Sequence, residues 1–110
     1  MNNDALVVFS TAPGTEVAEA LAEHLVTEQL AACVSLVDGI RSVYRWQGEV
    51  HRDSEVLLIV KTDQRRLEPL IETLQNRHPY DCPEIIAVPI VGGSADYLDW
   101  LASSLTTGSA

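Results

Sequence analysis

The sequence predicts an α/β (α+β) fold in which one four-stranded antiparallel sheet packs against helices. Three observations lead to this prediction. Apolar runs rich in β-branched residues alternate with apolar stripes at helical spacing. Gly, Pro and Asp separate these segments. The 110 residues, 46% of them apolar, suffice for one core. We therefore expect a single domain over residues 1–110, with flexible ends at 1–4 and 106–110.

The first strand and the first helix follow directly from the amino terminus. The run 5–9 is a β-branched-rich strand that ends before Pro13-Gly14. Thr15 is expected to cap the helix that follows, which ends near Gln29. The stripe that the helix buries consists of Val17, Ala18, Leu21, Ala22 and Leu25. The acidic residues on its solvent-exposed side are Glu16, Glu19 and Glu23.

A long hairpin comes next. Residues 32–46 predict one long, bent strand, in which Asp38-Gly39 forms a tight turn or a bulge. Gln47-Gly48 reverses the chain. The return strand covers 49–62, and we expect a second irregular point at Asp53-Ser54.

The second half repeats the pattern of the first. Asp63 caps a second helix that ends at Pro79, and the buried stripe of this helix is Leu67, Leu70, Ile71 and Leu74. Residues 84–90 predict the fourth strand, with Pro89 marking a sheet edge. Ser94 caps a last helix. The order is βαββαβ plus a C-terminal helix, which is the ferredoxin-like sandwich with both main helices on one face.

The strands are apolar on both faces, which predicts an oligomer. A sheet with one solvent-exposed face should alternate apolar and polar residues along its strands. No such alternation is present in Leu6–Phe9, Val56–Val60 and Ile85–Val88. Two helices cover only one face. Three copies around a threefold axis would bury the second face of each, and the long hairpin would reach a neighbour's sheet edge. The alternative is a monomer whose last helix closes that face.

Charge and motifs narrow the function classes. The formal net charge of -9 disfavours nucleic acid and anionic membrane surfaces as partners. There is no long apolar segment and no signal peptide, so we expect a cytoplasmic protein. A periplasmic location stays open, because a removed signal would leave no trace. No nucleophile with a nearby base, HExxH motif or phosphate loop is present, so we expect no enzymatic activity.

Six segments, considered together, resemble the CutA divalent-cation-tolerance family. They are Val7–Ala12, Leu30–Val34, Tyr44–Gly48, Glu55–Thr62, His78–Glu84 and Tyr97–Trp100. No single segment is specific, but their order and spacing cover the chain from about residue 6 to 105. The resemblance implies a ferredoxin-like subunit in a homotrimer similar to the PII signalling proteins. It also implies a role in tolerance of divalent cations, copper especially, in bacteria.

Two residues are candidate metal ligands. Cys33 offers a soft thiolate that suits copper or zinc, or else it is a small buried hydrophobe. His78, at a helix end, could bind a metal or complement the helix dipole. The resemblance supports Cys33 as a metal contact. It also implies that Ser10 and Arg77 replace a cysteine and a histidine found in some relatives. The predicted site is therefore incomplete, and Cu²⁺ or another divalent cation would be weakly held.

The aromatic residues of the hairpin suggest an interface. Tyr44 and Trp46 are two apart and so share one face of their strand, as an interface, a cleft wall or a part of the core. Glu55 and Lys61 are six apart on one strand and also share a face.

The polar residues suggest a binding cleft. Lys61, Glu84, His78 and Tyr80 are predicted to gather between subunits, and Glu55 belongs to the same polar pattern of the family. The alternative is mutual salt-bridging across the trimer. We thus expect a metal-linked trimer, and as a second possibility a PII-like signalling trimer that binds a small molecule in this cleft.

Overall fold

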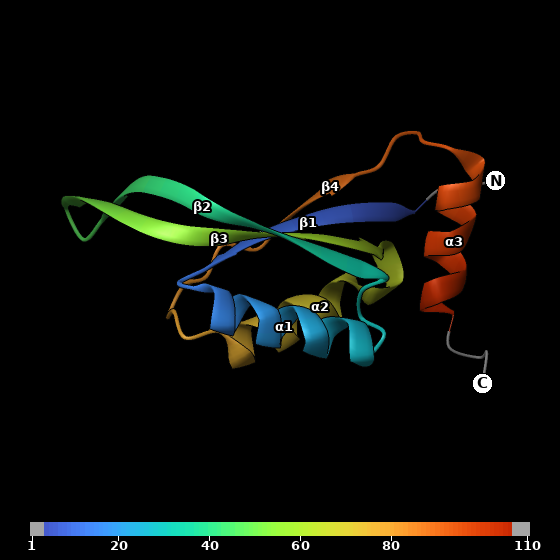
Figure 1. The fold of residues 1–110 in the computed structure, drawn as a ribbon, viewed down its shortest axis with the longest axis horizontal. Coiled ribbons are helices and arrows are strands. Elements are labelled where there is room, and N and C mark those ends of the chain that lie inside the picture. The colour runs from blue at the N-terminus through green and yellow to red at the C-terminus, as the bar shows by residue number, and fades with distance from the viewer. Residues whose placement is uncertain (1–3, 107–110) are drawn as a thin grey trace.

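The computed structural model describes residues 4–106 and has the predicted element order. The elements are β1 (Ala5–Ala12), α1 (Thr15–Thr27), β2 (Cys33–Trp46), β3 (Glu49–Asp63), α2 (Gln64–Arg77), β4 (Ile86–Pro89) and α3 (Ala95–Leu105). The antiparallel sheet has the order β2-β3-β1-β4. Helices α1 and α2 both lie on one face of this sheet, and α3 stands at its end (Figure 1). The ferredoxin-like prediction with an extra C-terminal helix is confirmed.

Strands β2 and β3 form a hairpin that projects well beyond the body of the domain (Figure 1). The register between them shifts from Val37↔Leu57 to Ile40↔Glu55, so Asp38 and Gly39 together face a single residue of β3. Gly39 has a φ of 76°, which glycine adopts without strain. This is the predicted β-bulge.

The expected second irregularity at Asp53-Ser54 is wrong. Pairing is continuous from Ile40↔Glu55 to Trp46↔Glu49, so both residues take regular places in the ladder. One bulge is enough to bend the hairpin. The hairpin turns at Gln47 and Gly48, whose φ values of 52° and 82° match a two-residue turn of type I′.

Two of the three predicted helix caps are confirmed. The side chains of Asp63 and Ser94 each accept the backbone N–H of the residue three positions on, at 3.1 Å and 3.2 Å. Thr15 is not a cap, because it is already the first residue of α1. Gly14 takes the cap position without a side-chain hydrogen bond.

Strand β4 is shorter than the predicted 84–90. It pairs with β1 only from Leu6↔Pro89 to Phe9↔Ile86, and no described strand pairs with its other side. Pro89 therefore lies on an edge strand, as expected of a residue without an N–H to donate.

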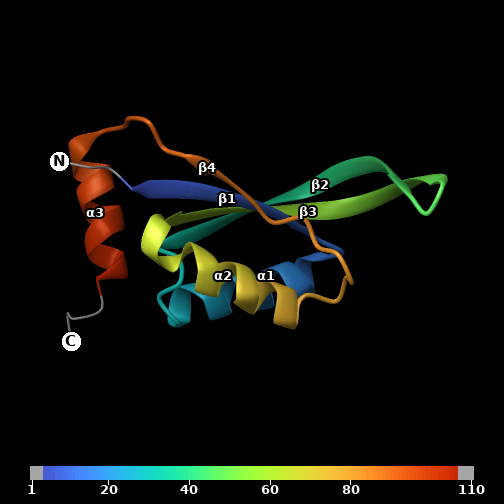
Figure 2. The same ribbon diagram turned by 180° about the vertical axis from the view of Figure 1, so that it is seen from behind.

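The main core lies between the sheet and the two helices. Its fully buried side chains are Val8, Ala12, Ala18, Leu58, Val60, Leu70 and Leu74. A second, smaller cluster joins α3 to the end of the sheet through Leu101 and Leu105, which pack on Ala5 and Ala32. Both views place α3 at the end of the sheet and not over its second face (Figure 2). The monomer alternative required the last helix to close that face, and the helix does not do so.

The predicted flexible ends fall mostly outside the described residues. At the borders, the Asp4 carbonyl accepts the Gln64 N–H at 2.9 Å, and the Thr106 hydroxyl donates to the Ala102 carbonyl at 3.0 Å. Within residues 4–106, no helix is long and apolar enough to cross a membrane.

Candidate functional site

The face of the sheet opposite α1 and α2 is apolar and uncovered, and we call it the open face. Strand alternation places on it Val7, Phe9, Val37, Leu57, Ile59, Ile86 and Val88. Ile86 is 54% exposed and Val88 42%. An uncovered apolar face of this extent marks an interaction surface in soluble proteins.

The bulge decides which residues of β2 belong to the open face. Before it, odd-numbered residues such as Cys33 lie there, and after it even-numbered residues such as Tyr44 do. Cys33 pairs with Lys61 and Tyr44 pairs with His51, and both partners are odd-numbered residues of the unbroken strand β3. The open face therefore continues along one side of the projecting hairpin.

A polar cluster interrupts the open face near α3. The Cys33 Sγ lies 3.6 Å from the Lys61 Nζ and 3.5 Å from the Tyr97 Oη. The Lys61 ammonium also reaches the Ser35 hydroxyl at 3.4 Å. The hydrogen bond to Cys33, then burial, raises the pKa of Tyr97 above 10.0, so its hydroxyl stays protonated at neutral pH. The cluster offers one positive charge, a thiol and two hydroxyls to a ligand or a partner.

His78 is buried at the junction between α2 and β1. Its Nε2 lies 2.7 Å from the Thr11 carbonyl, and its Nδ1 accepts the Tyr80 N–H at 3.1 Å. Because Nδ1 accepts, the hydrogen that bonds Thr11 is on Nε2. Both ring nitrogens thus hold the loop after α2 against β1. A metal ion would have to displace one of these bonds, so the geometry supports the structural role of His78.

Tyr80 and Glu55 form a second polar pair. The Tyr80 hydroxyl donates to the Glu55 carboxylate at 2.8 Å, and Glu55 is buried. Burial first, and the bond to Glu55 second, raise the pKa of Tyr80 above its usual 10.0. Glu84 is exposed and makes no hydrogen bond or ion pair with the other described residues.

The aromatic residues of the hairpin lie on its open-face side. Tyr44 donates to the Asp53 carboxylate, which raises the pKa of Tyr44, and its ring stacks on His51 at 5.4 Å. Trp46 is 45% exposed. Neither aromatic residue belongs to the core of its own chain, so this surface is suited to an interface.

The chain by itself does not gather the predicted cleft. Lys61 and Glu55 do share a face, but they are six positions apart on β3, which is about 20 Å along the strand. Lys61 lies with Cys33 at one end, while Tyr80 lies with Glu55 and His78 at the other. A cleft that joins the two groups needs a second subunit.

The position of Ser10 bears on the metal prediction. Ser10 points to the helix side of β1, fully buried, whereas Cys33 points to the open face. These two positions therefore cannot share an ion within one chain. The Ser10 hydroxyl also has no hydrogen-bond partner among residues 4–106.

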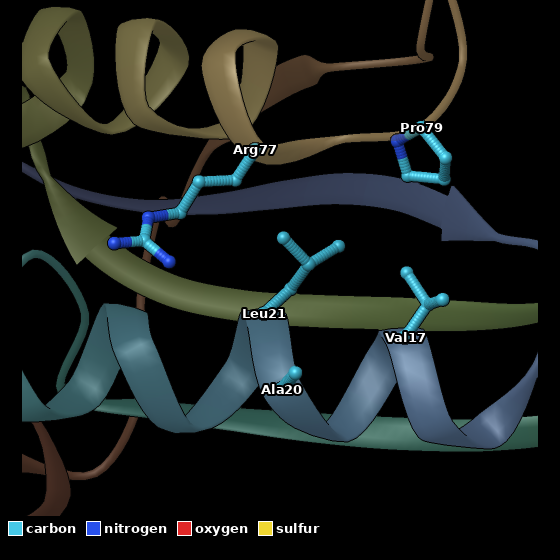
Figure 3. A pocket seen from close by; sticks show the side chains of 5 residues that line it. All are labelled: Val17, Ala20, Leu21, Arg77 and Pro79. Atoms are coloured by element: carbon cyan, nitrogen blue, oxygen red, sulfur yellow. The ribbon is translucent and has the colours of Figure 1, made fainter.

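Arg77 lines a hollow on the other side of the molecule. The hollow has a volume of about 270 Å³ and lies between α1 and α2, where Val17, Ala20, Leu21 and Pro79 form its walls (Figure 3). None of the predicted site residues lines it.

A family model described as "CutA1 divalent ion tolerance protein" matches residues 6–104. The chain belongs to the CutA1 family. The segments that carried the resemblance all lie within or next to the open face, the hairpin and the loop after α2.

Relatives in this CutA1 family include bacterial and plant proteins. The chain is 53% identical over 95 residues to a divalent-cation tolerance protein CutA of Thermus thermophilus, covering 86% of this chain and 92% of the relative. It is 54% identical over 100 residues to the chloroplastic protein CutA of Arabidopsis thaliana, covering 91% of this chain. It spans only 55% of that plant protein's length. The crystal structure of CutA from Xylella fastidiosa superposes with a TM-score of 0.91 at 39% identity, covering 94% of this chain and 99% of that one.

The donor set of this CutA1 chain does not fit a tight metal site. No group of three or more His, Cys, Asp or Glu side chains within the described range is placed to hold an ion. The Lys61 ammonium beside Cys33 opposes a second positive charge at that thiol.

Sequence reasoning missed Ser35 and Tyr97 as neighbours of Cys33. Ser35 follows Cys33 by two positions, so the strand pattern already placed both side chains on one face. Tyr97 comes from α3, and no local signal predicts that contact.

Proposed function

We propose that this chain forms a non-enzymatic homotrimer that takes part in tolerance of divalent cations, copper among them. The name of the relatives, divalent-cation tolerance protein, supports the proposed role in cation tolerance. The observation that carries the assembly is the uncovered open face, whose apolar side chains have no covering element within the described chain. A cytoplasmic location stays a prediction.

A threefold arrangement accounts for the open face and the hairpin together. Three open faces turned to a common axis would remove their apolar area from water. The hairpin would then reach past its own subunit to the next one. That contact would bring the Cys33 and Lys61 group of one subunit towards the Glu55 and Tyr80 group of another, as the predicted cleft requires.

The assembly is tested by light scattering of the purified protein at micromolar concentration. We expect the mass of three subunits. Ile86→Glu should reduce it, because the substitution places a charge on the open face. Val26→Glu is the matched control, since Val26 is 42% exposed on α1 and lies outside that face. A monomeric wild-type protein would overturn the proposal.

The cation part is tested by calorimetry with Cu²⁺ and Zn²⁺. We expect weak binding that Cys33→Ser reduces several-fold, with Cys82→Ser as the control, because Cys82 is an exposed loop cysteine. His78→Ala tests the second predicted ligand, with the melting temperature recorded alongside because the substitution also removes two hydrogen bonds. Binding weaker than about 1 mM that neither Cys33→Ser nor His78→Ala alters would reject the metal role.

The polar cluster favours a second candidate, a PII-like signalling trimer that binds a small molecule between subunits. An ammonium, a thiol and two hydroxyls within an apolar surface match the composition of ligand sites. Native mass spectrometry of freshly purified protein should then detect a bound molecule that Lys61→Met releases and Arg65→Met retains. Preparations free of any ligand would count against this candidate.

A further inference from the structure

The hollow between α1 and α2 lies on the helix-covered side of the sheet and not on the open face (Figure 3). Val17, Ala20 and Leu21 follow the i, i+3, i+4 spacing of one helix face, so α1 turns three apolar side chains towards it. Leu21 is 4% exposed and belongs to the main core. This wall of the hollow is therefore apolar and fixed by core packing.

The loop after α2 supplies a second wall. Pro79 directly follows His78, whose Nε2 lies 2.7 Å from the Thr11 carbonyl. The other ring nitrogen accepts the Tyr80 N–H at 3.1 Å. These bonds hold the chain on both sides of Pro79, and the proline ring itself restricts φ. The hollow is therefore formed without a ligand, which reduces the ordering cost of binding.

Arg77 places a positive charge at the mouth of the hollow. Its side chain reaches from the last residue of α2 towards α1, while Val17 and Leu21 point towards α2 from the opposite wall (Figure 3). Arg77 is exposed and forms no ion pair or side-chain hydrogen bond with another residue among 4–106. The planar fork of its free donors matches a carboxylate, which a guanidinium binds through two parallel N–H···O bonds.

The charges of the chain favour a ligand with a single negative charge. The net charge is -9, and Glu16, Glu19 and Glu23 lie along the exposed side of α1. This acidic field opposes multiply charged anions such as phosphate esters, whereas one guanidinium balances one carboxylate. The volume of about 270 Å³ lies just below the range of roughly 300–1,000 Å³ typical of sites for drug-sized ligands. The ligand is therefore a small molecule.

From these observations we propose that the hollow between α1 and α2 binds a small monocarboxylate with an apolar tail. Arg77 holds the carboxylate at the mouth, and the tail packs on Leu21 and Pro79, which removes apolar surface from water. The exposed Ala20 leaves space for the tail, because a longer side chain at this position would fill the hollow. The site needs no residue from a second subunit, so it is independent of the proposed trimer and of the metal role.

The test is a titration of the full chain with sodium hexanoate, followed by the NMR shifts of the backbone amides. We expect saturable shifts at Ala20, Leu21 and Arg77 with a Kd of about 1 mM, because a ligand this small makes few contacts. Hexanol carries the same tail without the charge, and acetate carries the charge without the tail. Each should bind about tenfold more weakly than hexanoate, because each makes only part of the contacts.

Two variants remove the two parts of the site separately. Arg77→Gln should weaken the binding of hexanoate about tenfold and leave that of hexanol unchanged, because it removes the charge alone. Ala20→Leu should abolish saturable binding of both molecules by filling the hollow. Arg65→Gln and Ala102→Leu are the matched controls, since both residues are exposed helix positions outside the hollow.

Each outcome decides the inference without reference to the oligomeric state. Binding of hexanoate that both Arg77→Gln and Ala20→Leu weaken, but neither control does, supports the site. No saturable shift at hexanoate concentrations up to about 50 mM would overturn it. Equal binding of hexanoate and hexanol would overturn the carboxylate class, because Arg77 would then have no part. Shifts confined to the surroundings of Cys33 and Lys61 would place the ligand in the polar cluster and also overturn the inference.

Discussion

Cys33 and Lys61 are direct partners across β2 and β3, and their Sγ and Nζ atoms lie 3.6 Å apart. A thiol at this place is therefore not a free soft ligand, since a positive charge lies beside it. The arrangement predicts that a single chain of this cation-linked family holds a divalent ion only weakly at its cysteine.

Removing that charge should strengthen cation binding at Cys33. Lys61→Met keeps the length of the side chain and removes the ammonium that repels a divalent ion. We expect the affinity for Zn²⁺ to rise about tenfold in calorimetry, because two charges about 4 Å apart near a surface interact by a few kcal/mol. Arg65→Met serves as the control. An unchanged affinity in Lys61→Met would show that Cys33 is not a contact of the ion.

The three tyrosines should ionise late in an alkaline titration followed by tyrosinate absorbance. Each has a pKa raised above 10.0, Tyr44 by Asp53, Tyr80 by burial and Glu55, and Tyr97 by Cys33. In the unfolded chain they ionise at a pKa of about 10. The stability that depends on the protonated tyrosines is thus complete below pH 10.0 and falls as the pH rises above it.

Tyr80→Phe isolates the contribution of the Glu55 pair to this effect. We expect the variant to lose less stability between neutral pH and about pH 11 than the wild type does, because one of the titrating groups is gone. Chemical unfolding at fixed protein concentration measures the difference. Equal alkaline losses in both proteins would mean that Tyr80 ionises in the same way folded and unfolded.

The Ser10 hydroxyl offers a test in the core. It is fully buried and has no hydrogen-bond partner among the described residues, which costs free energy. Ser10→Ala should therefore raise the free energy of unfolding by about 1 kcal/mol in urea titrations. Ser35→Ala, on the open face, should change it by less than about 0.5 kcal/mol. A destabilised Ser10→Ala protein would indicate that the hydroxyl has a partner after all.

Arg66 joins the ends of three helices. Its guanidinium donates to the Gln29 carbonyl after α1 at 3.2 Å, to the Leu105 carbonyl at the end of α3, and to the Asp63 carboxylate at 3.0 Å. Arg66→Ala should lower the free energy of unfolding by about 3 kcal/mol, since it removes several charge-assisted bonds at once.

The neighbouring Arg65 is the control for Arg66. Arg65 is exposed on α2 and its side chain forms no ion pair within residues 4–106, so Arg65→Ala should cost less than about 0.5 kcal/mol. Similar thermal and urea midpoints for the two variants would contradict the joining role of Arg66.

The order of the elements could be predicted from the sequence, because apolar periodicity and turn residues are local signals. The bulge at Asp38-Gly39 and two helix caps could be predicted for the same reason. Two of the errors, the Thr15 cap and the irregularity at Asp53-Ser54, arose where neighbouring residues suit alternative local structures. Gly14 took the cap position next to Thr15, and the polar pair Asp53-Ser54 proved compatible with a regular ladder.

The candidate site was harder to predict, because contacts between distant segments determine it. Cys33 and Lys61 were both singled out, yet for different sites, and only the register of β2 and β3 brings them together. The two bonds of the His78 ring depend on Thr11 and on the loop at Tyr80, which no spacing in the sequence connects.

The bulge at Asp38-Gly39 absorbs one extra residue of β2, because both residues face Val56 alone. Side chains alternate with a period of two, so a regular ladder through both residues would turn the outer part of β2 over. Tyr44 and Trp46 would then lie on the helix-covered side, and Arg41 and Arg45 would lie on the open-face side. A relative that lacks the extra residue would keep the same faces with a regular ladder, and its arm would lose the bend that the bulge introduces.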